Sequence, residues 1–192
     1  MEDKRYQNNK VELRNLLINQ RRSLLQTEWI QKSDRICKHI ENSSLFTQAN
    51  TVLAYFSFRK EADLSNLFIS RHQHQNKKWG FPRCVDKSLH WYFWEPNQPL
   101  VSNNYGIPEP SIDAQMVILS QVDLIIVPCV ACDHNGYRLG YGGGYYDRLF
   151  SLPQCESMPS IGVTFDFAYL PELPVESWDK KLQTVCTETG LK

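Results

Sequence analysis

A glycine-rich stretch at residues 136–150 constrains the fold of this chain more than any other segment. It follows residues 124–130, a short apolar run rich in β-branched side chains, which predicts a buried strand. The expected order is therefore a strand, a glycine loop and a short helix. Glycine lets the backbone adopt positive φ and lets its N–H groups approach a ligand closely, an arrangement that suits phosphate oxygens. We expect this role for Gly140, Gly142, Gly143 and Gly144.

Charged residues beside these glycines strengthen the case for a ligand. Arg138 and Arg148 are able to donate charge-assisted hydrogen bonds, and Asp147, one residue into the expected helix, is a hard oxygen ligand of the kind that binds Mg²⁺. The spacing matches neither common phosphate loop, because Tyr145 and Tyr146 stand where a P-loop has Lys and Ser or Thr, and Tyr145 replaces the last Gly or Ala of a dinucleotide fingerprint. For the glycines alone, a mobile surface loop is the alternative.

Residues 138–147, with the sequence RLGYGGGYYD, resemble the signature of the 5-formyltetrahydrofolate cyclo-ligases, also called 5,10-methenyltetrahydrofolate synthetases. The resemblance extends over nearly the whole chain and is most specific in this loop, which in the family cradles the ATP phosphates and also touches the folate. It implies that ATP is bound by Lys10, Arg14, Arg138, Leu139, Gly140, Tyr141, Gly142, Gly143, Gly144, Tyr145 and Tyr146.

The same resemblance implies the remaining site residues. The catalytic residues would be Arg138 and Tyr146, and Mg²⁺ would be bound by Asp147 and Asp179. The folate substrate would be bound by Phe56, Glu61, Tyr141, Gly142, Gly143, Gly144 and Tyr145.

The N-terminal region predicts a helix over residues 10–26 that carries a row of cations. Lys10 and Arg14 lie one turn apart, and Arg21 falls near the same angular position two turns later. Taken alone, these residues indicate a solvated basic edge. The resemblance implies instead that Lys10 and Arg14 reach the nucleotide phosphates.

A second ligand-binding segment is expected after the strand predicted over residues 51–58. A helix is predicted from Asp63 to about Arg71, and the loop between the strand and this helix contains Glu61. Open α/β sheets bind ligands at the carboxyl ends of their strands, which is where this loop would lie. The alternative for Glu61 is a charge favoured by the helix dipole.

Strands that alternate with helices predict an α/β fold with a mainly parallel sheet and helices on both faces. The other expected elements are a helix over residues 28–41, strands over 77–83 and 89–94 joined by a turn, a loop over 95–120 and a last strand over 160–165. The resemblance implies a Rossmann-like sheet of the type found in sugar-phosphate isomerases and CoA transferases. It also implies a single cyclo-ligase domain over residues 1–192.

Composition limits the partners of the chain. Because 21 Lys and Arg balance 21 Asp and Glu, no global electrostatic field favours nucleic acid or an acidic membrane. No apolar run approaches the roughly 20 residues of a membrane span. The six cysteines are scattered, so we expect reduced thiols, with Cys129 and Cys132 in the core rather than on a metal. We therefore expect a cytoplasmic monomer without a nucleic-acid or membrane partner.

The function that the resemblance implies is an ATP- and Mg²⁺-dependent cyclo-ligase. It would convert 5-formyltetrahydrofolate to 5,10-methenyltetrahydrofolate and release ADP and phosphate. Two alternatives use the same architecture: a sugar-phosphate isomerase or CoA transferase that spends no ATP, and a non-catalytic module that binds nucleotide or folate.

Overall fold

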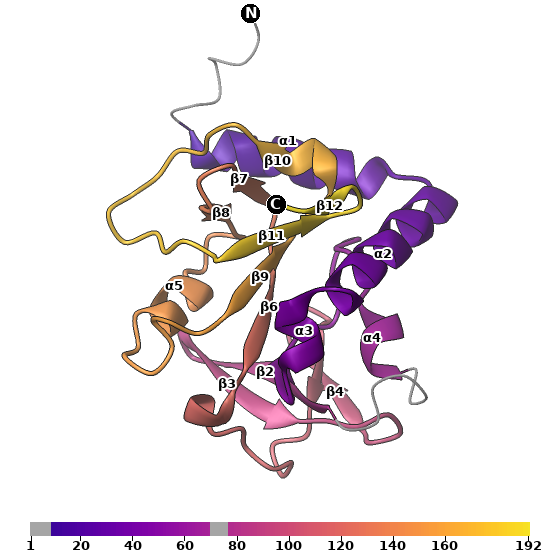
Figure 1. Ribbon diagram of the computed structural model, residues 1–192, viewed down its shortest axis with the longest axis vertical. Coiled ribbons are helices and arrows are strands. Elements are labelled where there is room, and N and C mark those ends of the chain that lie inside the picture. The colour runs from indigo at the N-terminus through magenta and orange to yellow at the C-terminus, as the bar shows by residue number, and fades with distance from the viewer. Residues whose placement is uncertain (1–8, 70–76) are drawn as a thin grey trace, which may run out of the picture.

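The computed structural model describes residues 9–69 and 77–192, and its largest element is a seven-stranded sheet (Figure 1). The strand order is β12-β11-β9-β6-β1-β2-β3. The five inner strands pair in parallel, whereas β3 and β12 pair antiparallel with their neighbours at the two edges. The strands are β1 (Thr51–Leu53), β2 (Lys78–Val85), β3 (Ser88–Phe93), β6 (Leu124–Pro128), β9 (Ser160–Val163), β11 (Thr184–Thr187) and β12 (Gly190–Leu191). The mainly parallel α/β sheet predicted from the sequence is confirmed.

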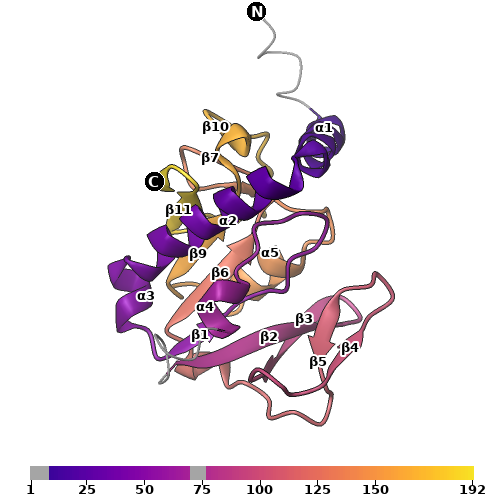
Figure 2. The same cartoon turned by 90° about the vertical axis from the view of Figure 1, so that its right-hand side faces the viewer.

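Helices cover both faces of this sheet because successive side chains of a strand point to opposite faces. In β6, Leu124 and Ile126 belong to one core cluster, whereas Ile125 and Val127 belong to another, and all four are fully buried. The first cluster includes residues of α2 (Gln26–Glu41), α3 (Ser44–Gln48) and α4 (Ser65–Ile69), and the second includes residues of α5 (Tyr145–Phe150). Figure 2 shows α2, α3 and α4 on one side of the sheet and α5 beyond it.

A smaller sheet of three strands lies beside the central sheet, in the order β10-β7-β8. Its strands are β7 (Ala131–Asp133), β8 (Arg138–Leu139) and β10 (Tyr169–Leu170). Helix α1 (Lys10–Ser23) packs against this region through Leu13, Leu17 and Ile18, which bury themselves against Leu139 and other apolar residues. This packing fixes α1 beside the glycine loop, because Leu139 directly precedes that loop.

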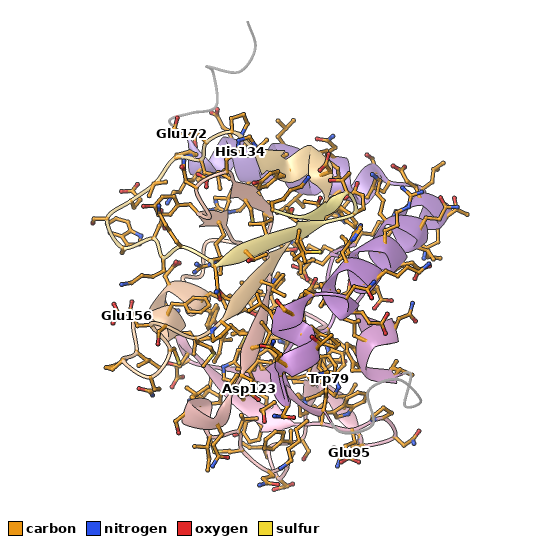
Figure 3. The ribbon with its side chains drawn as sticks, in the orientation of Figure 1. Trp79, Glu95, Asp123, His134, Glu156 and Glu172 are labelled. Carbon is orange, nitrogen blue, oxygen red and sulfur yellow. The ribbon has the colours of Figure 1, made fainter. Side chains whose placement is uncertain are left out.

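Polar groups fix the opposite end of the central sheet. Asp123, at the start of β6, accepts hydrogen bonds from the backbone N–H groups of Asn50 and Thr51, each at 2.8 Å. Figure 3 shows Asp123 in the lower half of the molecule and His134, which follows β7, near its upper end. The loops after β1 and after β7–β8 therefore lie at the carboxyl ends of the parallel strands, where α/β sheets bind ligands.

Short elements account for most differences from the sequence prediction. The expected strand over residues 51–58 ends at Leu53, because the chain then leaves the sheet toward a turn at Arg59 and Lys60, both at positive φ. The segment 95–120, predicted as a loop, contains β4 (Leu100–Ser102), β5 (Pro108–Pro110) and the start of the 3₁₀ helix Leu119–Gln121. A second 3₁₀ helix spans Asp166–Ala168.

Two further corrections concern element boundaries. The glycine loop does not follow β6 directly, because the antiparallel hairpin β7–β8 intervenes. The Asp133 side chain stabilises the turn of this hairpin by accepting from the N–H groups of Asn135 and Tyr137, each at 2.9 Å. Helix α4 begins at Ser65, two residues after Asp63, whose side chain accepts from Ser65 N at 2.9 Å as a helix cap does, and its predicted end at Arg71 lies outside the described residues.

Candidate active site

The glycine loop connects β8 to α5, and its tip is exposed at Tyr141, Gly142 and Gly143. Gly142 and Gly144 adopt positive φ, at 97° and 66°, and Gly144 caps the N-terminus of α5. Gly140 and Gly143 do not, so the expectation of positive φ is correct at two of the four glycines and wrong at the others. An added Cβ at Gly143 would lie 2.8 Å from the Tyr145 ring, whereas one at Gly140 would meet no atom within 4 Å.

Gly144, which has a positive φ, and Gly140, which does not, give a matched pair of variants. Gly144→Ala is expected to lower the free energy of unfolding by about 1–2 kcal/mol, because a side chain at positive φ is strained. The added Cβ would also lie 2.7 Å from Arg148 Nη1. Gly140→Ala is the control and should leave stability within about 0.5 kcal/mol of the parent. Urea-induced unfolding measures both, and equal losses would contradict the assignment of strain to Gly144.

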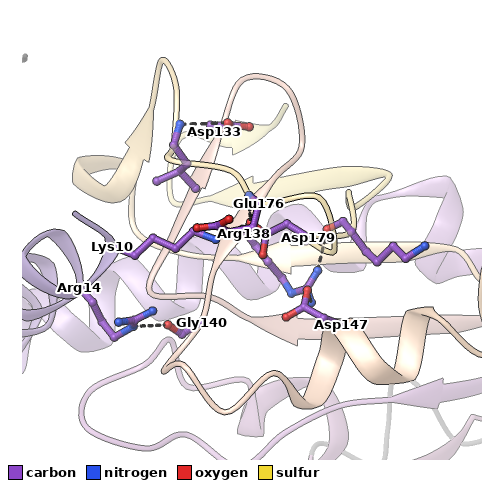
Figure 4. A network of polar contacts seen from close by, with 10 residues as sticks. Lys10, Arg14, Asp133, Arg138, Gly140, Asp147, Glu176 and Asp179 are labelled. Atoms are coloured by element: carbon purple, nitrogen blue, oxygen red, sulfur yellow. Dashed lines mark hydrogen bonds and ion pairs between the residues drawn. The ribbon is translucent and has the colours of Figure 1, made fainter. Parts of the chain in front are cut away.

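Two cations of α1 face the site from the other side. The helix starts after Asn9, whose side chain accepts from Val11 N at 3.0 Å and so caps the first turn. Arg14 Nε donates to the Gly140 carbonyl at 2.6 Å, and Lys10 forms an ion pair with Asp179. Figure 4 shows both side chains reaching from α1 toward the segments that carry these partners. The structure thus brings together cations and a loop that are over 120 residues apart in sequence, as the 126-residue separation of Arg14 and Gly140 illustrates.

Arg138 lies inside the site rather than on its surface. Its side chain is 4% exposed, and its guanidinium donates to Asp147 Oδ1 at 2.5 Å and to the Lys180 carbonyl at 2.7 Å. The guanidinium also lies near the rings of Tyr146 and Phe150, at 5.9 and 5.4 Å from their centroids. Arg138 therefore links β8, α5 and the C-terminal segment in one network (Figure 4).

The two predicted metal ligands are each paired with a different cation. Asp147 is the third residue of α5 and pairs with Arg138, whereas Asp179 pairs with Lys10 and accepts from Glu176 N at 2.7 Å. Within residues 9–69 and 77–192, no group of three or more His, Cys, Asp or Glu residues could hold a metal ion. Mg²⁺ usually binds through one or two carboxylates together with substrate phosphates, so each of these aspartates has the chemistry of a ligand that a nucleotide would complement.

Glu61 reaches the glycine loop from the loop that follows β1. It is 5% exposed, and its Oε2 accepts from Phe58 N at 3.0 Å. Burial raises the pKa of Glu61 to about 7, although the nearby Arg21 guanidinium and hydrogen bonds from Phe58 N–H and Tyr141 oppose this shift. A glutamate with this pKa changes charge near neutral pH, which is a property of functional carboxyl groups.

The aromatic residues of the predicted site have different surroundings. Phe56 is half-buried and stacks on Phe81, with ring centroids 4.2 Å apart. Burial raises the pKa of Tyr146 well above its ordinary value, so its phenol is neutral at pH 7 and acts as a hydrogen-bond donor or acceptor rather than as a base. The Tyr145 hydroxyl donates to the Asp86 carbonyl at 3.2 Å, at the turn between β2 and β3.

Arg148, which the sequence suggests as a phosphate ligand, is bonded to backbone carbonyls. Its Nε donates to the Lys87 carbonyl at 2.6 Å and its Nη2 to the Gly143 carbonyl at 2.8 Å. It thereby ties the glycine loop to the β2–β3 turn.

The sequence analysis assigned no site role to Arg21, which is 3% exposed and donates to the Tyr141 hydroxyl. The sequence did indicate that Arg21 lies in the same row of cations as Lys10 and Arg14, which was the available sign that it could reach the site.

Comparisons with known proteins identify the family of this chain. Residues 6–188 match the sequence model of the 5-formyltetrahydrofolate cyclo-ligase family. The chain is 34% identical over 176 residues to the 5-formyltetrahydrofolate cyclo-ligase of Escherichia coli K12. This match covers 89% of this chain and 96% of that protein. It is 33% identical over 156 residues to the Haemophilus influenzae 5-formyltetrahydrofolate cyclo-ligase, covering 79% of this chain and 83% of that protein.

Two solved structures resemble the fold. The NMR structure of Aquifex aeolicus 5,10-methenyltetrahydrofolate synthetase has a TM-score of 0.83 at 30% identity and covers 95% of this chain and 91% of that one. The 5,10-methenyltetrahydrofolate synthetase from Mycoplasma pneumoniae has a TM-score of 0.75 at 20% identity, covering 94% of this chain and 99% of that one. The second likeness concerns the fold alone.

Proposed function

This chain belongs to the 5-formyltetrahydrofolate cyclo-ligase family, and we propose that it uses ATP and Mg²⁺ to convert 5-formyltetrahydrofolate to 5,10-methenyltetrahydrofolate, with release of ADP and phosphate. The observation that carries the proposal is the exposed glycine loop with the Arg14 guanidinium held against it at Gly140. Exposed backbone N–H groups beside a cation suit the oxygens of a nucleotide phosphate.

The chemistry explains why a phosphoryl donor is needed. The formyl carbon on N5 is a poor electrophile because the nitrogen lone pair delocalises into the carbonyl, and its oxygen is a poor leaving group. ATP supplies a phosphoryl group that makes this oxygen a good leaving group. N10 of the same folate then attacks this carbon and forms the new C–N bond. N10 loses its proton, the C–O bond breaks, and the oxygen departs with phosphate. Because both nitrogens belong to one molecule, correct orientation accelerates the step.

The residues of the chain would bind and orient the reactants. We assign the phosphates to Lys10, Arg14 and Arg138, together with the backbone amides of residues 140–144. The folate would contact Phe56, Glu61 and the tyrosines of the loop. We assign Tyr146 to the reacting centre, where its neutral phenol could hydrogen-bond to the formyl oxygen. The protein would thus act by positioning and by neutralising charge, as in phosphoryl transfer generally.

Asp147 and Asp179 would hold the metal ion. Bound Mg²⁺ neutralises phosphate charge and bridges phosphate oxygens in enzymes of phosphoryl transfer. Arg138 and Lys10 pair with these carboxylates and would keep them oriented toward the phosphates. Each of these two ion pairs would be close to neutral before the negatively charged nucleotide binds.

We further propose that the protein acts as a cytoplasmic monomer without nucleic acid or membrane. Among the helices of the described residues, none is both long and apolar enough to span a bilayer. Charge balance at 21 basic and 21 acidic residues supports the absence of a nucleic-acid partner. Sedimentation equilibrium would test the monomer, and a mass twice that of the chain would contradict it.

The direct test mixes purified protein with Mg-ATP and 5-formyltetrahydrofolate and follows the near-ultraviolet absorbance of the methenyl product. Reactions without ATP or without Mg²⁺ are the controls. We expect the absorbance band to grow only in the complete mixture. If folded protein binds ATP but forms no methenyl product, the cyclo-ligase proposal is wrong.

Arg14→Ala tests the nucleotide assignment. We expect the Michaelis constant for ATP to rise about tenfold or more, because a charge-assisted hydrogen bond to phosphate is lost. Folding should change little, since Arg14 is only half-buried. Arg22→Ala is the matched control, an exposed cation on the same helix. An unchanged Michaelis constant in Arg14→Ala would remove this residue from the nucleotide site.

A further inference from the structure

Three polar side chains connect α1, the loop after β1 and the glycine loop. Arg21 is 3% exposed and Glu61 is 5% exposed, so both are buried. Arg21 Nη2 donates to the Tyr141 hydroxyl, and the Glu61 carboxyl is near enough to this hydroxyl for each group to shift the pKa of the other. Because the hydroxyl accepts from Arg21, its own proton is available to an acceptor such as the Glu61 carboxylate. Tyr141 as a whole is 39% exposed, although its hydroxyl contacts the buried Arg21.

The same arginine supports a strained turn that immediately precedes Glu61. Arg59 and Lys60 have φ of 49° and 56°, a conformation that side chains with a Cβ rarely adopt. Arg21 Nε donates to the Arg59 carbonyl at 3.1 Å. Lys60 Nζ donates to the carbonyls of Arg22, at 3.2 Å, and of Leu24. The turn is therefore anchored to the C-terminal end of α1, and Figure 2 shows this loop extending from the sheet toward α1.

We propose that Arg21 is a positioning residue, which holds the Glu61 loop and the glycine loop together by donating to the Arg59 carbonyl and the Tyr141 hydroxyl at the same time. The proposal rests on the proposed function, in which Glu61 and Tyr141 contact the folate. An arginine suits this role because its planar guanidinium has several donors in a fixed fork, whereas a lysine is a single point of charge. Arg21 would thus set where the folate meets the loop that binds ATP.

The charges around Glu61 give this role a measurable consequence. Arg21 faces Glu61 from α1, Tyr141 from the glycine loop, Tyr55 from the segment after β1 and Tyr146 from α5. Arg21 is the positively charged group among these neighbours of Glu61, and the others are phenols. Its charge lowers the pKa of the Glu61 carboxyl, against the larger effect of burial. Without Arg21, Glu61 should remain protonated to higher pH and should bind a cationic or N–H donor group of the folate less well.

The test compares Arg21→Met and Arg21→Lys with Arg22→Met, which removes an exposed cation one residue away. Circular dichroism and thermal unfolding establish that each variant is folded. The Michaelis constant for 5-formyltetrahydrofolate is measured at several pH values. The Glu61 carboxyl is titrated by NMR in protein labelled with ¹³C at the glutamate carboxyl carbons, and Glu61→Gln assigns its signal.

We expect Arg21→Met to raise the Michaelis constant for the folate about 10- to 100-fold at pH 7, because it removes both hydrogen bonds of the guanidinium. The Glu61 titration should move to higher pH, whereas Arg22→Met should change neither quantity. Arg21→Lys keeps the charge but not both hydrogen bonds, so it should raise the Michaelis constant while the Glu61 titration stays closer to that of the parent. A folded Arg21→Met or Arg21→Lys with the parent's Michaelis constant would overturn the proposal.

A double-mutant cycle with Tyr141→Phe tests whether Arg21 acts through the Tyr141 hydroxyl. In the Tyr141→Phe background, Arg21→Met should raise the Michaelis constant by a clearly smaller factor than in the parent, because the shared contact is already gone. Fully additive effects would show that Arg21 does not act through this hydroxyl. The NMR titration needs no turnover, so the absence of methenyl product from the parent would count against the proposed function and not against the contacts of Arg21.

Discussion

Asp147→Asn is expected to lower Mg²⁺-dependent turnover by at least about a hundredfold, because the amide cannot replace a charged oxygen ligand of a magnesium ion. The substitution keeps the size of the side chain and an oxygen that is able to accept from Arg138. The charge-assisted part of that contact is lost, so the free energy of unfolding should fall by about 1–3 kcal/mol. Product absorbance at saturating substrates, measured over a range of Mg²⁺ concentrations, gives the loss of turnover.

The control for this variant is Glu156→Gln, which neutralises an exposed carboxylate shortly after α5. We expect it to keep the turnover and the Mg²⁺ dependence of the parent. Urea-induced unfolding of both variants separates a loss of metal from a loss of structure. An Asp147→Asn protein that turns over at the parent's rate would remove Asp147 from the metal site.

The second large effect concerns the pH dependence of stability. Burial raises the pKa of Glu61 from 4.5 to about 7, so between these values the folded protein binds a proton that the unfolded chain has released. Stability from this group is therefore fully present below about pH 4.5 and is lost as the pH rises to 7. The expected loss across this window is about 3 kcal/mol, from the shift in pKa.

Glu61→Gln isolates this contribution because the amide does not titrate. We expect the difference in unfolding free energy between the Gln variant and the parent to move in favour of the variant as the pH rises from 4.5 to 7, and then to level off. Urea-induced unfolding at intervals of one pH unit measures it. A difference that stays constant across this range would mean that Glu61 keeps an ordinary pKa in the folded protein.

Sequence periodicity was sufficient for the longer elements. The apolar run at residues 124–130 became β6, and the two aromatic segments joined by a polar turn became the β2–β3 hairpin. Such segments are predictable because the side chains that must face a core recur at the spacing of a strand or a helix. The glycines before α5 likewise indicated a loop followed by a helix, which the structure has at Tyr145–Phe150.

Strands of two or three residues could not be predicted in this way. β7, β8, β4 and β5 are each too short to show a repeat, and they form because a partner strand is already in place. The hairpin β7–β8 matters for the site, because it separates the glycine loop from the end of β6 and places it beside α1. The local sequence pattern does not predict this position of the loop.

The residue types needed for a phosphate and folate site are evident in the sequence, and the resemblance of residues 138–147 indicated their chemistry. Only the tertiary structure decided which of them meet. Arg14 and Gly140 are 126 positions apart, and Arg21 and Tyr141 are 120 apart. Their contacts depend on β1 lying parallel to β6, so that the loops after both strands open at the same end, and on α1 packing beside the glycine loop. Strand order and helix packing arise from the burial of the whole apolar surface, which no single segment of the sequence specifies.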